Sequence, residues 1–354
     1  MMALYDYGNT RLRAQTSRMF SPQTLDSFAD LNSLDRLISH LSKSHYKNSI
    51  EISLTYAHGY GCITHALHRE LLEIRQVLER FYDQRLWEKI RTIFMRVDLQ
   101  NIKTIFRGIL HKSNIDMIIR SLSPLGTLPE YILTAISKSE NIQDAIDKMI
   151  VFELDFANEL LRLKSSSDPI YSSEIERILE IWFFKHIETI LRGGDKNLKL
   201  LRQLNNKEVD TVNINTLLRF IDAPNSPELE KNPIEYFLVN GGEIERQLFL
   251  DLSKETSVKI AITQIALHNY HDELVEALVR YEQNGLLSEF EKSLRIHTNR
   301  WLSKLTKLNP FGIGVPMGYI ALRKNEIRNI RWIADGIYSG FEKDYIKDNI
   351  EIIK

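Results

Sequence analysis

Apolar residues along this chain recur at intervals of three and four, which is the spacing of one face of an α-helix. Runs of strand length in which apolar and polar residues alternate are scarce, and glycine and proline number only 15 and 9 in 354 residues. The pattern therefore predicts an all-α fold. Two apolar stripes illustrate it: Leu67, Leu71, Ile74 and Leu78, and the set Ile175, Ile178, Leu179, Trp182, Phe183 and Ile187.

A ten-residue pattern occurs twice, as DLQNIKTIFR at 98–107 and as DTVNINTLLR at 210–219. A degenerate third copy lies within NEIRNIRWIADG at 325–336, where Glu326 takes the place of the aspartate. The shared asparagines of the three copies follow one another at intervals of 112 and 116 residues. A period close to one third of the chain predicts three similar helical domains, which we place at 1–118, 119–228 and 229–354.

A second marker repeats with a similar period. LNSLDRLISHL at 31–41, SENIQDAIDKM at 139–149 and ETSVKIAITQI at 255–265 each put polar residues before an apolar helical pattern. Serine and asparagine are preferred N-cap residues, so each segment is expected to begin a helix.

The ten-residue motif itself is interpreted as a capping and packing device, in preference to a partner contact. Asp98 and Asp210 are expected at N-cap positions, because a carboxylate there accepts the first free amide groups of a helix. A helical wheel separates an apolar side, which should pack, from a polar side that could hydrogen-bond a neighbouring helix. The apolar side holds Ile102, Phe106 and Ile109, and the polar side holds Asn101, Thr104 and Arg107.

Charge and cysteine content narrow the function classes. Lys and Arg number 46 against 47 Asp and Glu, so the chain lacks the cationic field of a nucleic-acid-binding protein. The single cysteine, Cys62, rules out an internal disulfide and fits a reducing compartment. We find no signal-peptide pattern and no apolar run long enough to cross a membrane, so the chain is expected to be soluble and cytoplasmic.

Candidate chemistry is sparse. GIGVPMG at 312–318 lacks the Lys-Ser/Thr of a phosphate-binding loop and is expected to be an interhelical turn. His58, Cys62 and His65 could share one helical face and hold zinc, but two glycines weaken the helix there, and an ordinary polar face is favoured. We therefore predict no catalytic residue, no cofactor and no metal. A helical enzyme using these three residues remains a less favoured alternative.

The third repeat resembles a known family. LNPFGIGVPMGYIALRKNEIRNIRWIADGI at 308–337 is similar to the C-terminal segment of the C subunit of archaeal and bacterial V-type (A-type) rotary ATPases, and to the same end of the d subunit of eukaryotic vacuolar ATPases. The shared features are a loop with proline and glycine, the pair Gly318-Tyr319, and Lys324, Glu326, Asn329, Ile330, Arg331 and Ile333 on the helix. YGNTRLRA at 7–14 resembles the opening helix of that family. Trp332 and Asp335 depart from the pattern of the first two motifs.

The resemblance implies three helical domains around a pseudo-threefold axis, forming a funnel. It implies a non-catalytic central-stalk adapter that joins the central shaft of the ATP-hydrolysing head to the membrane proteolipid ring. Such a chain is peripheral to the membrane, on its cytoplasmic face, and is held there by protein contacts. We expect Arg107, Arg219 and Arg331 to contact the shaft, although hydrogen bonding between helices of one domain would also explain these arginines. The alternative is a helical-repeat scaffold for another partner, which would form an open stack with exposed ends.

Overall fold

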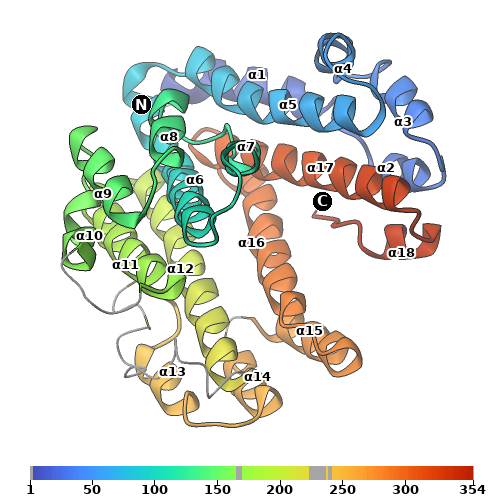
Figure 1. Ribbon diagram of the computed structural model, residues 1–354. Coiled ribbons are helices and arrows are strands. Elements are labelled where there is room, and N and C mark those ends of the chain that lie inside the picture. The colour runs from blue at the N-terminus through green and yellow to red at the C-terminus, as the bar shows by residue number, and fades with distance from the viewer. Residues whose placement is uncertain (1–2, 165–169, 223–236, 238–240, 269, 354) are drawn as a thin grey trace. The chain divides into compact units, whose positions relative to one another are not determined.

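A computed structural model describes residues 3–164, 170–222, 237, 241–268 and 270–353. Its regular structure over these residues consists of 18 helices and no strand (Figure 1). The all-α prediction is confirmed. The chain divides into two compact units, described separately below: unit 1 comprises 1–91, 123–125 and 299–354, and unit 2 comprises 92–122 and 126–298. The repeat boundaries at 118 and 228 stay a prediction.

Unit 1 contains both the N-terminal and the C-terminal part of the chain. It also contains the first turns of α6 (Gln84–Leu110) and the last turns of α16 (Ser288–Leu308). Its other helices are α1 (Ala3–Thr16), α2 (Pro22–Ala29), α3 (Leu34–Leu41), α4 (Lys47–Leu54), α5 (Gly59–Phe81), α17 (Gly314–Ser339) and α18 (Lys343–Asp348).

Unit 2 contains the remainder of α6 and α16 and the helices between them. These are α7 (Ile115–Ser121), α8 (Glu130–Ser137), α9 (Ile142–Val151), α10 (Ala157–Lys164), α11 (Ser172–Ile190), α12 (Lys196–Asp222), α13 (Arg246–Leu252), α14 (Val258–Ala266) and α15 (His271–Asn284).

The second sequence marker predicted three helix starts correctly. α3, α9 and α14 begin directly after Ser33, Asn141 and Ser257. Each of these three side chains accepts a hydrogen bond from the backbone N–H three residues later, which is the N-cap geometry. The repeated polar residues thus fix equivalent helix starts in all three thirds of the chain.

Helix α17 is the buried centre of unit 1. It packs against α1, α2, α3 and α5, and Figure 1 shows it beside α5. Gly314 and Gly318 allow α17 to approach α16 closely, since a Cβ at either position would lie within 3.0 Å of the carbonyl oxygen of Leu305 or Leu302. The prediction of an interhelical turn for GIGVPMG is correct only for Gly312 and Ile313, because from Gly314 onward the stretch forms the start of α17.

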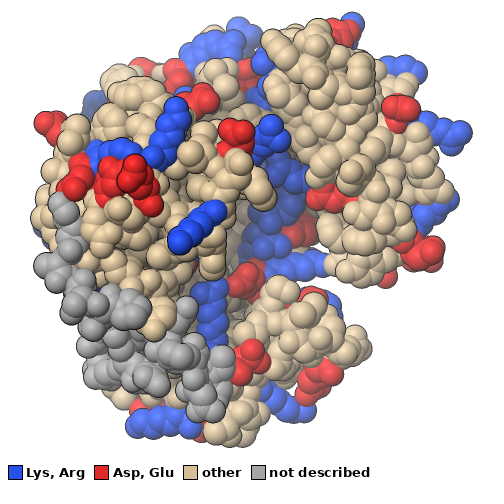
Figure 2. Space-filling view, in the orientation of Figure 1, with Lys and Arg blue, Asp and Glu red and all other residues tan. Residues whose placement is uncertain are grey.

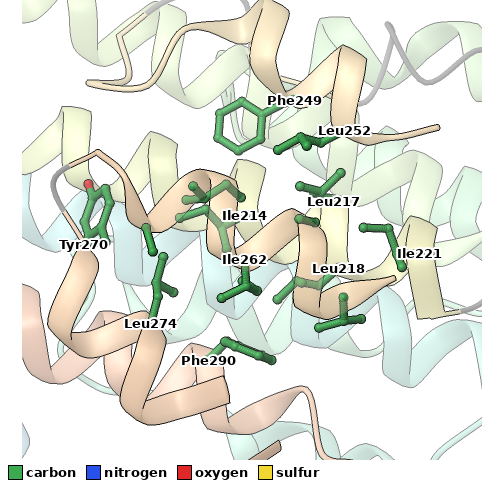
Figure 3. Close-up of a cluster of buried hydrophobic side chains, with 14 of the residues drawn as sticks. Ile214, Leu217, Leu218, Ile221, Phe249, Leu252, Ile262, Tyr270, Leu274 and Phe290 are labelled. Carbon is green, nitrogen blue, oxygen red and sulfur yellow. The ribbon is translucent and has the colours of Figure 1, made fainter. Parts of the chain in front are cut away.

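One face of α12 packs into the apolar core that surrounds the second motif in unit 2 (Figure 3). Ile214, Leu217 and Leu218 are almost fully buried there, together with Phe249 of α13 and Ile262 of α14. Of the apolar side predicted for the first motif, Ile102 and Phe106 are likewise buried on α6, whereas Ile109 is only partly buried.

Lys and Arg side chains and Asp and Glu side chains are both present over the face shown in Figure 2, in keeping with the near-equal numbers in the sequence. Among the described residues, no helix has the length and apolar character that crossing a membrane requires.

Candidate functional site: the three motif helices

The three motifs lie in the middle of long helices, α6, α12 and α17. The N-cap prediction for Asp98 and Asp210 is therefore wrong. The helices had already begun upstream, where buried residues such as Phe94 and Leu204 continue the apolar face. Both aspartates nevertheless bind free amide groups, but those amides belong to a different segment of the chain.

In the first motif, Asp98 holds the loop that precedes α8. Its carboxylate accepts hydrogen bonds from the backbone N–H groups of Thr127 and Leu128, both at 2.9 Å, and from the Thr127 hydroxyl at 2.5 Å. Gly126 lies against the carboxylate so closely that a Cβ there would come within 3.0 Å of Oδ1. A larger residue at position 126 would therefore collide with the Asp98 carboxylate.

In the second motif, Asp210 makes the equivalent contacts with the loop before α13. It accepts from the N–H groups of Glu243 at 3.0 Å and Ile244 at 3.2 Å, and Gly242 again lies against the carboxylate. The Tyr270 hydroxyl donates a third bond at 2.8 Å, and Figure 3 shows this ring at the edge of the apolar cluster. Burial raises the pKa of Asp210, although these hydrogen bonds oppose the shift.

In the third motif, Glu326 holds the loop before α2. It accepts from the Phe20 N–H at 2.6 Å and from the Tyr46 hydroxyl at 3.0 Å. His45 Nε2 lies 2.9 Å from the same carboxylate. Burial works to raise the pKa of Glu326, but the hydrogen bond of His45 and the charge of Arg323 outweigh it and lower the pKa. The acid of the degenerate third copy therefore binds a loop before a helix, as Asp98 and Asp210 do.

The three contacts follow a cyclic order when they are placed on the predicted repeats. The acid of repeat 1 holds the loop that opens the helices of repeat 2, and the acid of repeat 2 does the same for repeat 3. The acid of repeat 3, Glu326, holds the corresponding loop of repeat 1 at Phe20. Each contact lies within a single compact unit.

A buried cation accompanies the acid of the third motif. Arg323 of α17 donates to Glu70 of α5 and to Glu326, and its guanidinium lies 5.1 Å from the centre of the Tyr46 ring. Burial tends to lower the pKa of Arg323, but the neighbouring Tyr46, Glu326 and Glu70 outweigh it and raise the pKa. Glu70 also accepts from Ser49 at 2.5 Å, so α17, α5 and α4 share one network.

The other two motif helices make comparable networks, each with the long helix that precedes the next motif helix along the chain. Arg96 and Lys103 of α6 both pair with the buried Glu180 of α11. Lys207 of α12 lies 3.5 Å from His297 of α16, which is 2.9 Å from Glu273. Breaking one partner of a buried ion pair costs about 3 to 5 kcal/mol, because it leaves a charge without compensation.

The three arginines predicted to contact a partner lie at exposed positions with different surroundings. Arg107 Nε lies 2.6 Å from Glu176 of α11, and the arginine side chain is 47% exposed. Arg219 is 63% exposed and lies 3.6 Å from Glu291 of α16. Arg331 is exposed, and within the described part of the chain it has no carboxylate at ion-pair distance. Their role in binding stays a prediction.

The three residues of the less favoured metal-binding alternative do not form a metal site. His65 Nδ1 lies 2.8 Å from the Ser53 hydroxyl, Cys62 is fully buried, and His58 occupies the N-cap position of α5. In the described ranges, no three His, Cys, Asp or Glu side chains are placed so that they could hold a metal ion.

Sequence reasoning missed the glycines and tyrosines that complete the acid-centred contacts. Tyr46 and Tyr270 stand directly before α4 and α15, at equivalent places in their repeats. The corresponding residue before α10 is Phe156, and there the Thr127 hydroxyl supplies the extra bond to the acid. Aligning the third short helix of each repeat would have revealed the two tyrosines.

Comparisons with known proteins agree on one family. A family model described as ATP synthase (C/AC39) subunit matches residues 8–349. The C subunit of the A-type ATP synthase of Methanosarcina acetivorans is 25% identical over 358 residues, which cover 99% of this chain and 93% of that protein. The same subunit of Methanosarcina mazei is 26% identical, covering 99% and 93%. That of Methanocaldococcus jannaschii is 21% identical, covering 98% and 86%.

Proposed function

The chain belongs to the ATP synthase (C/AC39) subunit family, and from this premise we propose that it is the non-catalytic central-stalk adapter of a V/A-type rotary ATPase. In this role it couples the central shaft of the ATP-hydrolysing head to the membrane proteolipid ring. It sits at the cytoplasmic face of the membrane and is held there by protein contacts. ATP turnover in the head then drives ion transport through the ring.

The proposal rests on the cyclic order of the acid-centred contacts. An open stack of repeats would leave the acid of its last repeat without a loop to hold. Here Glu326 is buried and accepts the Phe20 N–H from the first repeat. This return to the first repeat favours a cyclic order of contacts over an open stack of repeats.

The buried polar networks suit a part that transmits torque. Each network ties a motif helix to a long helix of the following repeat through side chains of low exposure. Hydrogen bonds between charged groups are about twice as strong as neutral ones, and buried pairs are weakly screened by salt. Such cross-links oppose sliding of one helix along the other when the chain is loaded.

Arg107, Arg219 and Arg331 are proposed to contact the shaft. Arg331 has the strongest case, because it is exposed and no carboxylate of the described chain occupies its guanidinium. Arg107 has the weakest case, because Glu176 already binds it. A cationic contact surface would favour an acidic patch on the shaft.

Removing the chain from membranes that carry the complex tests the proposal. ATP hydrolysis by the head is expected to continue while ATP-driven ion transport stops, because the shaft and ring are no longer joined. Adding the purified chain back should restore transport. Full ion transport in membranes without the chain would contradict the proposal.

A further inference from the structure

A polar recess of about 380 Å³ opens in unit 1, between the end of α1 and the helices α4, α5 and α17. This volume falls in the range of small-molecule binding sites, roughly 300 to 1,000 Å³. Its lining is mostly charged or amide-bearing, so an apolar ligand would gain little from it. All of the lining residues belong to this one unit.

Two arginines in the lining have no partner among the residues that the structure describes. Arg18 and Arg69 make no hydrogen bond, ion pair or ring contact with any of them through their side chains. The Nε of Arg69 is fully shielded from solvent and still lacks an acceptor. A buried donor without an acceptor costs free energy, so this guanidinium favours a ligand that brings acceptor oxygens.

The other charges of the recess are already compensated. Arg323 is occupied by Glu70 and Glu326, and Glu73 lies 3.4 Å from Arg80. The guanidiniums of Arg18 and Arg69 are thus the uncompensated charges among the described groups that line the recess. The charged side chains of the lining are the three arginines Arg18, Arg69 and Arg323 and the two glutamates Glu70 and Glu73, so their sum is positive.

Arg18 is specific to the first repeat. It stands three residues before the N-cap Ser21, and the same place before α8 and α13 is occupied by Gly126 and Gly242. In those repeats the glycine makes room for the motif aspartate. Here the acid is the longer Glu326, and the position carries a guanidinium that lines the recess. The first repeat therefore has a hydrogen-bond donor where the other two have a packing residue.

We propose that this recess binds a small phosphate-bearing anion between Arg18 and Arg69. A guanidinium presents paired N–H donors that match two oxygens of one phosphate group. The amide side chains of Asn48 and Gln76 also line the recess and supply further donors. Arg107 and Arg219 belong to unit 2, and Arg331, although it is in unit 1, does not line the recess, so the proposed site uses none of the proposed shaft contacts.

Isothermal titration calorimetry of the purified full-length chain with inorganic phosphate, pyrophosphate and ADP tests the proposal. At least one of the three is expected to bind saturably with one site per chain. Binding of all three would identify a single phosphate group as sufficient, whereas binding of pyrophosphate and ADP alone would identify a diphosphate. The absence of saturable binding for all three would overturn the proposal.

Variants locate the site. Arg18→Gln and Arg69→Gln are each expected to weaken binding at least tenfold, while Arg11→Gln and Arg75→Gln, on α1 and α5 outside the recess, leave it unchanged. Circular dichroism and thermal unfolding of each variant confirm that it is folded. Binding that survives either recess substitution at full strength, or that falls equally in the control variants, would overturn the assignment.

Discussion

Replacing Arg107 by glutamine should destabilise unit 2 in a way that depends on pH. Arg107 Nε lies 2.6 Å from Glu176, whose side chain is only 16% exposed. Burial works to raise the pKa of Glu176, but the hydrogen bond from Arg107 and the charges of Lys103 and Arg107 outweigh it and hold the pKa at about 2. The ordinary value for this carboxyl is 4.5.

The size of the effect follows from this difference. A carboxyl whose pKa falls from 4.5 to about 2 on folding contributes roughly 3 kcal/mol of stability at neutral pH. Because the folded pKa is depressed, this stability is fully present above pH 4.5 and is lost as the pH falls toward 2. Arg107 supplies the hydrogen bond and one of two charges, while the buried Lys103 remains. The Arg107→Gln variant should therefore lose about half, ~1–2 kcal/mol.

Urea unfolding followed by circular dichroism, at pH 7 and at pH 3, measures this loss. Arg219→Gln is the matched control, because Arg219 occupies the same motif position but forms an exposed pair at 3.6 Å. Such a surface pair contributes about 0–1 kcal/mol. At pH 7, Arg107→Gln should lower the free energy of unfolding by more than Arg219→Gln does. At pH 3, the loss caused by Arg107→Gln should be smaller. Equal losses in the two variants, or a loss that grows as the pH falls, would refute the reasoning.

Two further substitutions test the acid-centred contacts, both by urea unfolding. Gly126→Ala should lower the free energy of unfolding by about 1 to 3 kcal/mol, because the added Cβ would collide with the Asp98 carboxylate. The control Gly194→Ala should lower it much less, since no atom lies within 4 Å of a Cβ at that position. Equal losses in the two variants would disprove the close packing at Gly126. Tyr270→Phe should lose about 1 to 3 kcal/mol, since it removes a buried donor to Asp210 at 2.8 Å. An unchanged unfolding midpoint for Tyr270→Phe would show that the hydroxyl is not needed.

Features set by local sequence were predictable. The all-α fold class followed from the spacing of apolar residues. The starts of α3, α9 and α14 followed from their polar caps, because an N-cap depends on residues within one turn of the helix. These caps are Ser33, Asn141 and Ser257. The buried faces of α5 and α11 also matched the predicted stripes, with Leu71 and Trp182 only partly buried.

Features set by distant segments were not predictable. Asp98 looked like an N-cap because its carboxylate does bind free amides, but they lie at Thr127 and Leu128. Nothing near Glu326 in the sequence points to Phe20, 306 residues away. The recess of Arg18 and Arg69 likewise combines segments that only the fold brings together.

The most direct test of the adapter function is capture of both partners by one tagged chain. The tagged protein is mixed with the shaft subunits and with the detergent-solubilised proteolipid ring of the same organism. We expect both to be retained, and we expect Arg331→Glu to lose the shaft while it keeps the ring. Retention of neither partner by a folded chain would contradict the adapter account and favour the helical-repeat scaffold.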